Sequence, residues 1–261
     1  DVTSFCDPKM NVTGERDINN WANTAETQTA GNISYAPFAD NAAFFDKYYQ
    51  DMLVINGVDA QTNSHSTGVL HNWSGRNSEG YPSITAMFAA HNAPDQPLSY
   101  VNSGGFGYTA DLIRFSRLEN VDVLRQLLVP EKESDEVYIR SPGDMARIRE
   151  YRNQRHTRLL SDPNIISRTQ DNLAAYDSAL RSKSSLSDFE KFIPANEDIE
   201  PNEQVNNQVN SNLKRQMQMT LATFEAGIGS AADLFAQGYD THSDHDTLHE
   251  SLFSHLTDSI D

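Results

Sequence analysis

The sequence predicts an α/β fold, a doubly wound sheet interrupted by a largely helical insertion. Three observations lead to this prediction. Residues 1–117 mix short apolar runs with helical patterns, residues 118–227 show almost entirely helical periodicity, and residues 228–261 return to a strand, a glycine break and a helix. We therefore expect the first part of an α/β core, a helical insertion, and a last segment that completes the core.

In the first part, residues 38–50 carry aromatic side chains at helical spacing, and the apolar run 52–55 predicts a short strand. Residues 59–80 are rich in Ser, Thr and Asn and predict a loop. A helix over residues 82–90 and a strand over residues 98–101 should follow. These elements give the strand and helix alternation of an α/β core.

In the insertion, Ser141 followed by Pro142 is typical of a helix start, with the serine as cap and proline at the first helical position. A second helix is predicted by four apolar residues at intervals of four, which would form its buried stripe: Val205, Val209, Leu213 and Met217. The insertion should therefore consist of helices.

In the last segment, residues 231–236 predict a buried strand, and Gly238 supplies a break after it. Apolar residues then recur at helical spacing from residue 248 to residue 260, which predicts a helix that covers the sheet. Asp240 and His242 would lie at the carboxyl end of the strand. Open α/β sheets place their binding sites at that edge.

The segment 238–249 holds three aspartates and three histidines, the highest density of metal-ligating side chains in the chain. Imidazole nitrogen together with carboxylate oxygen suits zinc, manganese or iron, whereas calcium sites use oxygen ligands almost alone. We expect Asp240 and His242 to bind a divalent metal ion, zinc first, with His245 as a further candidate. The alternative is a solvated, acidic helix start. His255 is expected to pack or to face water.

The composition excludes several classes of protein. With 261 residues and 38% hydrophobic content, the chain can form a sizeable core. Its net charge of −17 argues against nucleic-acid partners and anionic membrane surfaces. No run approaches the roughly 20 apolar residues that span a bilayer, and no signal peptide is evident. The single Cys6 leaves the redox compartment undecided, and nothing indicates the oligomeric state.

The loop before the predicted helix 82–90 carries a second group of candidates, because hydroxyls beside a metal ion can become nucleophiles. Thr62, Ser64 and His65 lie in this loop, and Arg76 follows. Serine and threonine are also common in loops simply because they hydrogen-bond local backbone. The catalytic interpretation therefore requires this loop to meet Asp240 and His242 in space.

Four segments occur in an order that resembles a known family: Asp1–Ser4, Ser64–Gly68, Gly80–Ser83 and Gly238–His242. Together they are similar to the bacterial secreted domain of unknown function 1501 family, which belongs with the alkaline phosphatase and sulfatase superfamily. The Gly-aromatic-Asp-Thr-His match is the most specific of the four. The resemblance covers both ends of the chain and little of the helical middle.

The resemblance implies a periplasmic or secreted, metal-dependent hydrolase that acts on a small anionic ester of phosphate or sulfate. Asp1 would be a metal ligand from the first strand, and Asp240 with His242 the later ligand pair. Thr62 is the preferred nucleophile, ahead of Ser64 and Ser66. His65 and Arg76 would contact the anionic group.

The resemblance also implies a strand before Asp1 and, beyond Asp261, a further strand with an acidic residue and an Asp-His pair. We therefore expect the chain to be an excerpt, incomplete at both ends. Two alternatives to the enzyme remain. One is a non-catalytic secreted module that binds a polymer or a protein through the insertion, with Trp21, Trp73 and the Tyr48-Tyr49 pair exposed. The other is a metal-sequestering acidic surface.

Overall fold

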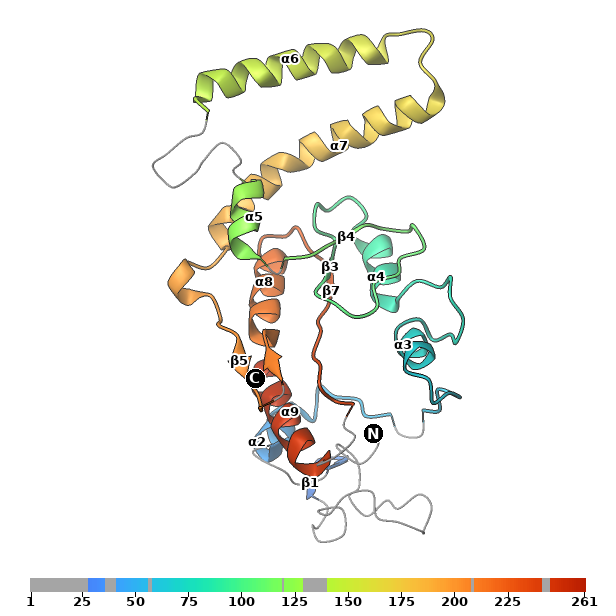
Figure 1. The fold of residues 1–261 in the computed structure, drawn as a ribbon, viewed down its shortest axis with the longest axis vertical. Coiled ribbons are helices and arrows are strands. Elements are labelled where there is room, and N and C mark those ends of the chain that lie inside the picture. Colours follow the sequence, from blue (N-terminus) through green and yellow to red (C-terminus); the bar gives the residue numbers. More distant parts are fainter. Residues whose placement is uncertain are drawn as a thin grey trace. The chain divides into compact units, whose positions relative to one another are not determined.

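The structure is a computed structural model that describes residues 28–35, 41–55, 58–118, 120–128, 140–207, 209–240 and 245–261. It divides into two compact units. Unit 1 comprises Asp1–Glu79, Glu200–Met217 and Leu234–Asp261, and unit 2 comprises Gly80–Ile199 and Gln218–Asp233. The fold is mixed α/β and includes a parallel sheet of three strands, which confirms the predicted class at this level (Figure 1).

The described residues of unit 1 form two short hairpins, three whole helices and the start of a fourth. Its elements are β1 (Gln28–Ala30), β2 (Ile33–Tyr35), α2 (Asn41–Tyr48), α3 (His65–Ser74), β5 (Glu203–Gln204), β6 (Asn210–Ser211) and α9 (His245–Ile260). The β1-β2 hairpin packs on α2, where the rings of Tyr35 and Phe45 stack with centroids 4.3 Å apart. The expected helix at residues 38–50 is confirmed as α2. The expected final helix is confirmed as α9, which contacts α2; its predicted position over the sheet stays a prediction.

The strand predicted at residues 52–55 does not form. Met52 and Val54 pack against the aromatic cluster around Phe45, while Leu53 is 83% exposed and Ile55 is 68% exposed. The apolar run therefore buries one face only. No strand pairs with this segment among the described residues, and an extended segment without a partner does not become a strand.

The loop predicted at residues 59–80 contains the helix α3. Ser64 precedes the helix in an extended conformation, and Gly75 ends it in the left-handed conformation, with φ of +68°. The N–H of Gly75 donates to the carbonyl of His71 over 2.8 Å, which satisfies one of the last carbonyls of the helix. The polar composition predicted a loop, although Ser64 and Gly75 are residue types typical of a helix start and a helix end.

The predicted helical stripe from Val205 to Met217 is wrong in its first half, where β5 and β6 form a hairpin. The N–H of Val205 donates to the carbonyl of Val209 over 3.0 Å, and the side chain of Asn206 accepts from the N–H of Val209 over 2.9 Å. Asparagine favours such turns because its side chain can replace a backbone acceptor. The helix α8 (Leu213–Glu225) begins only after the hairpin.

Unit 2 contains the parallel sheet, with strand order β4 (Phe115–Ser116), β3 (Tyr100–Asn102) and β7 (Ala231–Asp233). The helix α4 (Ile84–Asn92) lies against β3 and β7 through Ala86 and Ala89, both fully buried. Small side chains allow this close approach of helix and sheet. The predictions of a helix at 82–90 and of strands near 98–101 and 231–236 are confirmed, although both strands are shorter or shifted.

Helices also make up most of the segment predicted as an insertion. They are α5 (Val121–Leu128), α6 (Pro142–Leu160) and α7 (Ser167–Phe189), followed by short turns at Glu190–Phe192 and Asn196–Asp198. Ser141 caps α6 as predicted, because its hydroxyl accepts from the N–H of Asp144 over 3.1 Å. Figure 1 shows α6 and α7 as consecutive helices joined by a short loop. No helix in the described ranges is long and apolar enough to span a membrane.

The main hydrophobic core of unit 2 joins α5, α7 and the second half of α8 to the sheet. Its fully buried members include Phe189 and Met219, with Val101 contributed by β3. Burial of a large apolar side chain stabilises the fold by about 1.5–3 kcal/mol. This core fixes the strand β3, whose carboxyl end carries the polar residues described below.

Candidate functional site

The predicted hydroxyl loop lies at the start of α3. The N–H of Ser64 donates to the Oγ1 of Thr62 over 3.1 Å, and the hydroxyls of Ser64 and Ser66 are 3.2 Å apart. Thr62 is half-buried and Ser64 is exposed. The loop is therefore held by local hydrogen bonds, as its residue types allow, and it presents its hydroxyls near the surface.

The approach to Asp240 depends on Gly238. This residue has a φ of +96°, and a Cβ at this position would lie 2.5 Å from the Cγ2 of Val209 and 3.4 Å from the Cδ2 of Leu252. A side chain here would therefore meet both backbone strain and a steric clash. The glycine break predicted after the strand is confirmed.

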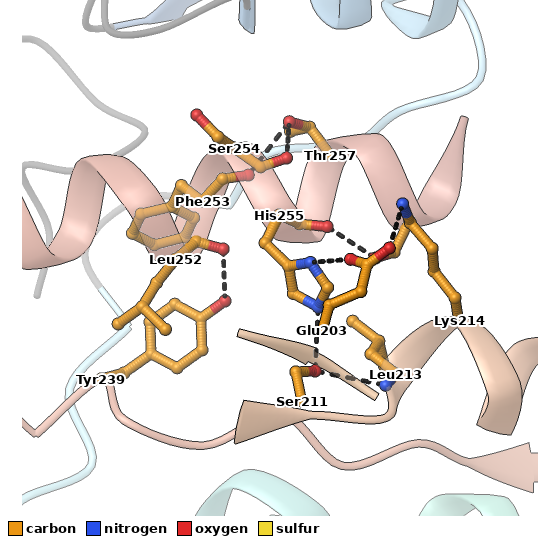
Figure 2. A network of polar contacts seen from close by, with 11 residues as sticks. Glu203, Ser211, Leu213, Lys214, Tyr239, Leu252, Phe253, Ser254, His255 and Thr257 are labelled. Carbon is orange, nitrogen blue, oxygen red and sulfur yellow. Dashed lines mark hydrogen bonds and ion pairs between the residues drawn. The ribbon is translucent and has the colours of Figure 1, made fainter. Parts of the chain in front are cut away.

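The next residue, Tyr239, anchors the segment to α9, as Figure 2 shows for its hydroxyl. That hydroxyl donates to the carbonyl of Leu252 over 3.2 Å, and the ring packs edge-on against Phe253 with centroids 5.2 Å apart. The Nε2 of His249 lies 2.9 Å from the carbonyl oxygen of Tyr239. Because a carbonyl only accepts, Nε2 carries the proton. Burial raises the pKa of Tyr239 to about 12.

Asp240 meets the hydroxyl loop through His65. The Nε2 of His65 and the Oδ2 of Asp240 are 3.4 Å apart, and the two side chains are 79% and 60% exposed. The sequence required this loop to meet both Asp240 and His242. The contact with His65 brings the loop to Asp240, and His242 lies outside the described residues. The side chains of His65 and Asp240 are both open to solvent. Each can therefore give up its contact with the other and contact a ligand instead.

The structure describes only some of the other predicted site residues. Asp1 and His242 lie outside the described residues. His245 is the first residue of α9, and its side chain also lies outside them. Arg76 follows α3, with an exposed side chain and a backbone N–H that donates to the hydroxyl of Ser74 over 3.2 Å. The structure thus brings together His65 and Asp240 and leaves the rest of the predicted ligand set untested.

The described residues contain no group of three or more His, Cys, Asp or Glu side chains arranged to hold a metal ion. Three of the four predicted ligands, Asp1, His242 and the side chain of His245, lie outside the described part of the chain. The chemistry of the donors still fits the expectation, since the exposed carboxylate of Asp240 adjoins the imidazole of His65. A nitrogen and oxygen donor set suits zinc and its neighbours in the first transition row.

Sequence reasoning missed a second polar cluster, at the carboxyl end of the parallel sheet. Asp233 ends β7 and is 2% exposed. The hydroxyl of Tyr100 donates to one of its carboxylate oxygens, and the hydroxyl of Thr85 donates to the other over 2.5 Å. Burial, followed by the hydrogen bond to Asp233, raises the pKa of Tyr100 to about 12. An acidic residue within the buried strand predicted at residues 231–236 was the available signal.

This cluster also organises the loop after β3. Asn102 is fully buried; its side-chain amide donates to the hydroxyl of Tyr100 and to the carbonyl of Phe106, each over 3.1 Å. Its side-chain oxygen accepts from the N–H of Gly104 over 3.1 Å. Buried polar groups that satisfy one another in this way fix a single loop conformation.

The aromatic residues expected to be exposed in a binding module are differently placed. Tyr48 and Tyr49 are half-buried and pack against the cluster around Phe45, and Trp73 is half-buried in α3. Trp21 lies outside the described residues. The Tyr48-Tyr49 pair therefore contributes to the core of unit 1.

No family model, curated protein or solved structure matches this chain. The resemblance of its four segments to a hydrolase family therefore stays a prediction.

Proposed function

We propose that the chain is a metal-dependent hydrolase of small phosphate or sulfate esters, with an alkaline-phosphatase-like scaffold and a periplasmic or secreted location. The observation that supports this proposal best is the 3.4 Å approach of His65 to Asp240. It joins two segments that the sequence marks independently, one by its hydroxyls and one by its density of metal-ligating side chains.

The proposed metal ligands are Asp240 and His242, with His245 and Asp1 completing the set. When bound, a divalent cation would stabilise negative charge on the ester oxygens. The fixed backbone at Gly238 and Tyr239 supports Asp240, and a supported ligand loses less conformational entropy when it binds. Zinc is the first expectation, with manganese and iron as alternatives.

The proposed nucleophile is the hydroxyl of Thr62. The N–H of Ser64 donates to this oxygen, and the same N–H would stabilise negative charge that develops there during attack. The Thr62 oxygen bonds to the phosphorus or sulfur atom while His65 accepts its proton. The bond to the leaving oxygen breaks, and His65 returns the proton to that oxygen. Arg76 would contact the remaining anionic oxygens, and water then hydrolyses the threonine ester.

The test combines elemental analysis with turnover of p-nitrophenyl phosphate and p-nitrophenyl sulfate, on chain purified without an affinity metal. We expect stoichiometric metal and measurable turnover in the unmodified chain. The double variant Asp240→Ala with His242→Ala should lose both. The matched control is His91→Ala with Asp95→Ala, because both residues are exposed and the change removes the same two residue types.

Two single variants then separate the hydroxyls. Thr62→Ala should keep its metal and lose turnover by about three orders of magnitude, whereas Ser64→Ala should keep both. The reverse result would assign the nucleophile to Ser64. Metal binding that is unchanged in the Asp240 and His242 variant would overturn the proposal, and absence of metal from the unmodified chain would favour the binding module.

A further inference from the structure

Three polar side chains from three elements of unit 1 meet in a network that the proposed hydrolase site does not use (Figure 2). The Nε2 of His255, in α9, lies 2.8 Å from the Oγ of Ser211, in β6. The Nδ1 of the same ring lies 3.0 Å from the Oε2 of Glu203, in β5. A hydroxyl, an imidazole and a carboxylate are thus connected in series.

The β5-β6 hairpin accounts for two of these positions. Glu203 and Ser211 are directly opposite each other in the antiparallel register. Side chains of such a pair lie on the same face of the hairpin and close together. His255 projects from α9 onto that face, and its side chain is only 11% exposed. The arrangement therefore results from the backbone register together with the packing of one helix.

The charge of Glu203 determines which ring nitrogen of His255 carries the proton in the neutral ring. The Nζ of Lys214 lies 2.9 Å from the Oε1 of Glu203. This contact is the main cause that lowers the pKa of Glu203, and His255 adds to it. An ionised carboxylate only accepts hydrogen bonds, so the Nδ1 of His255 must donate. In the neutral ring, Nε2 then has no proton and can only accept.

The hydrogen bonds of Ser211 agree with this assignment. Its Oγ accepts from the N–H of Leu213 over 3.2 Å, so the hydroxyl proton is available for the Nε2 of His255. Every donor in the series of hydrogen bonds from Leu213 to Glu203 then faces an acceptor. This is the tautomer and the orientation that a histidine needs to act as base toward a serine.

We propose that Ser211, His255 and Glu203 form a second catalytic centre, a nucleophilic triad that cleaves carboxylic esters. The Oγ of Ser211 bonds to the acyl carbon while its proton passes to the Nε2 of His255. The bond between acyl carbon and leaving oxygen breaks, and His255 returns the proton to the leaving alcohol. Water repeats the two steps on the acyl-serine and releases the acid.

The surroundings indicate which esters this centre takes. Ser211 precedes α8, whose N-terminus carries partial positive charge that favours an oxyanion nearby. Ser211 is half-buried, which favours a small acyl group over a bulky one. The net charge of −17 and the carboxylate of Glu203 disfavour anionic substrates at this centre, whereas a bound cation would offset that charge at the proposed hydrolase site. The substrates should be small, neutral carboxylic esters.

The test is covalent labelling with a fluorophosphonate probe, followed by mass spectrometry of the labelled peptide. We expect one label, on Ser211, and hydrolysis of p-nitrophenyl acetate that Ser211→Ala abolishes. His255→Gln should slow labelling by about a hundredfold or more, since the base is lost. The matched control is Ser254→Ala, which removes a neighbouring serine hydroxyl and should label like the unmodified chain.

Glu203→Gln separates a catalytic from a structural role, because it keeps the size of the side chain but lets the amide donate to the ring. Labelling should fall by about tenfold or more, while the circular dichroism spectrum stays unchanged. A folded protein that does not label at Ser211, or that labels equally well in His255→Gln, would overturn the proposal and leave the network a purely structural one.

The two proposed centres can be told apart in the same preparation. Labelling of Ser211 should persist in the presence of a chelator and in the Asp240 and His242 double variant. Turnover of the phosphate or sulfate esters should not. Loss of labelling together with loss of metal would contradict the independent triad.

Discussion

Asp233 and Asp240 are close in the sequence and occupy opposite chemical settings. Asp233 is 2% exposed and accepts hydrogen bonds from the hydroxyls of Tyr100 and Thr85. Asp240 is 60% exposed in its side chain and lies beside the imidazole of His65. A buried carboxylate with its acceptors satisfied holds strands and loops in place, whereas an exposed one can exchange its partner for a ligand.

The largest effect should come from removing the buried carboxylate. Asp233→Ala would leave the buried hydroxyls of Tyr100 and Thr85 without their acceptor, and we expect a loss of about 3 kcal/mol in the free energy of unfolding. Asp240→Ala is the matched control and should change it by less than about 0.5 kcal/mol. Urea unfolding followed by circular dichroism measures both. Equal losses would remove the distinction between the two carboxylates.

A smaller effect should follow from disturbing the support of Asp240. Gly238→Ala adds a Cβ that collides with Val209, at a φ that already disfavours side chains. Gly80→Ala is the matched control, because Gly80 has a φ of +97° and no atom within 4 Å of the added Cβ. We expect a loss of about 1 kcal/mol for Gly80→Ala from strain alone, and about 1–2 kcal/mol more for Gly238→Ala.

If the two glycine variants unfold at the same urea concentration, the approach of Gly238 to Val209 does not constrain the segment. Metal content of the same samples adds a second measurement. Gly238→Ala should also weaken metal binding, since it displaces the backbone next to Asp240, and Gly80→Ala should not.

The next largest loss of stability should come from removing the hydroxyl of Tyr239. Tyr239→Phe removes the hydrogen bond to the carbonyl of Leu252 but keeps the ring contacts with Phe253 and His249. The expected loss in unfolding free energy is about 1 kcal/mol, as for an ordinary hydrogen bond. Tyr151→Phe is a suitable control because Tyr151 is 65% exposed, and it should have no measurable effect. A similar loss in both variants would contradict the anchoring role of Tyr239.

The last effect is absent at neutral pH, where the preceding variants are compared, and appears only at alkaline pH. The pKa of Tyr100 is raised to about 12 in the folded chain, against about 10 when unfolded. Between these values the folded state holds the proton and the unfolded state does not, so stability falls as pH rises through this window. Urea midpoints measured from pH 9 to 11.5 should fall less steeply for Tyr100→Phe than for the unmodified chain.

The parts of the fold that could be predicted from the sequence are those with local signals. The start of α6 follows from Ser141 and Pro142, and the break before Asp240 follows from Gly238. The β5-β6 hairpin could not be predicted in this way, because its apolar residues also fit a helical stripe. The side chain of Asn206, which closes the turn, decides between the two patterns.

The candidate site divides in the same way. The density of histidine and aspartate marked Asp240, and residue type marked His65, but their proximity required the folded chain. The network around His255 has no local signal, because Ser211 is 44 positions away in the sequence. The buried cluster at Asp233 likewise depends on partners more than a hundred positions away.

The pairing of β3 with β7 has a consequence for synthesis of the chain. Ser99 and Ser230, which flank these strands, are hydrogen-bonded across 131 positions, so a ribosome adding roughly 5–20 residues per second needs on the order of ten seconds to deliver the second strand after the first. During that interval one edge of β3 has no partner, and Tyr100 and Val101 are not covered by β7. Nascent chains of unit 2 should therefore depend on chaperones more strongly while this edge is open than after β7 has emerged.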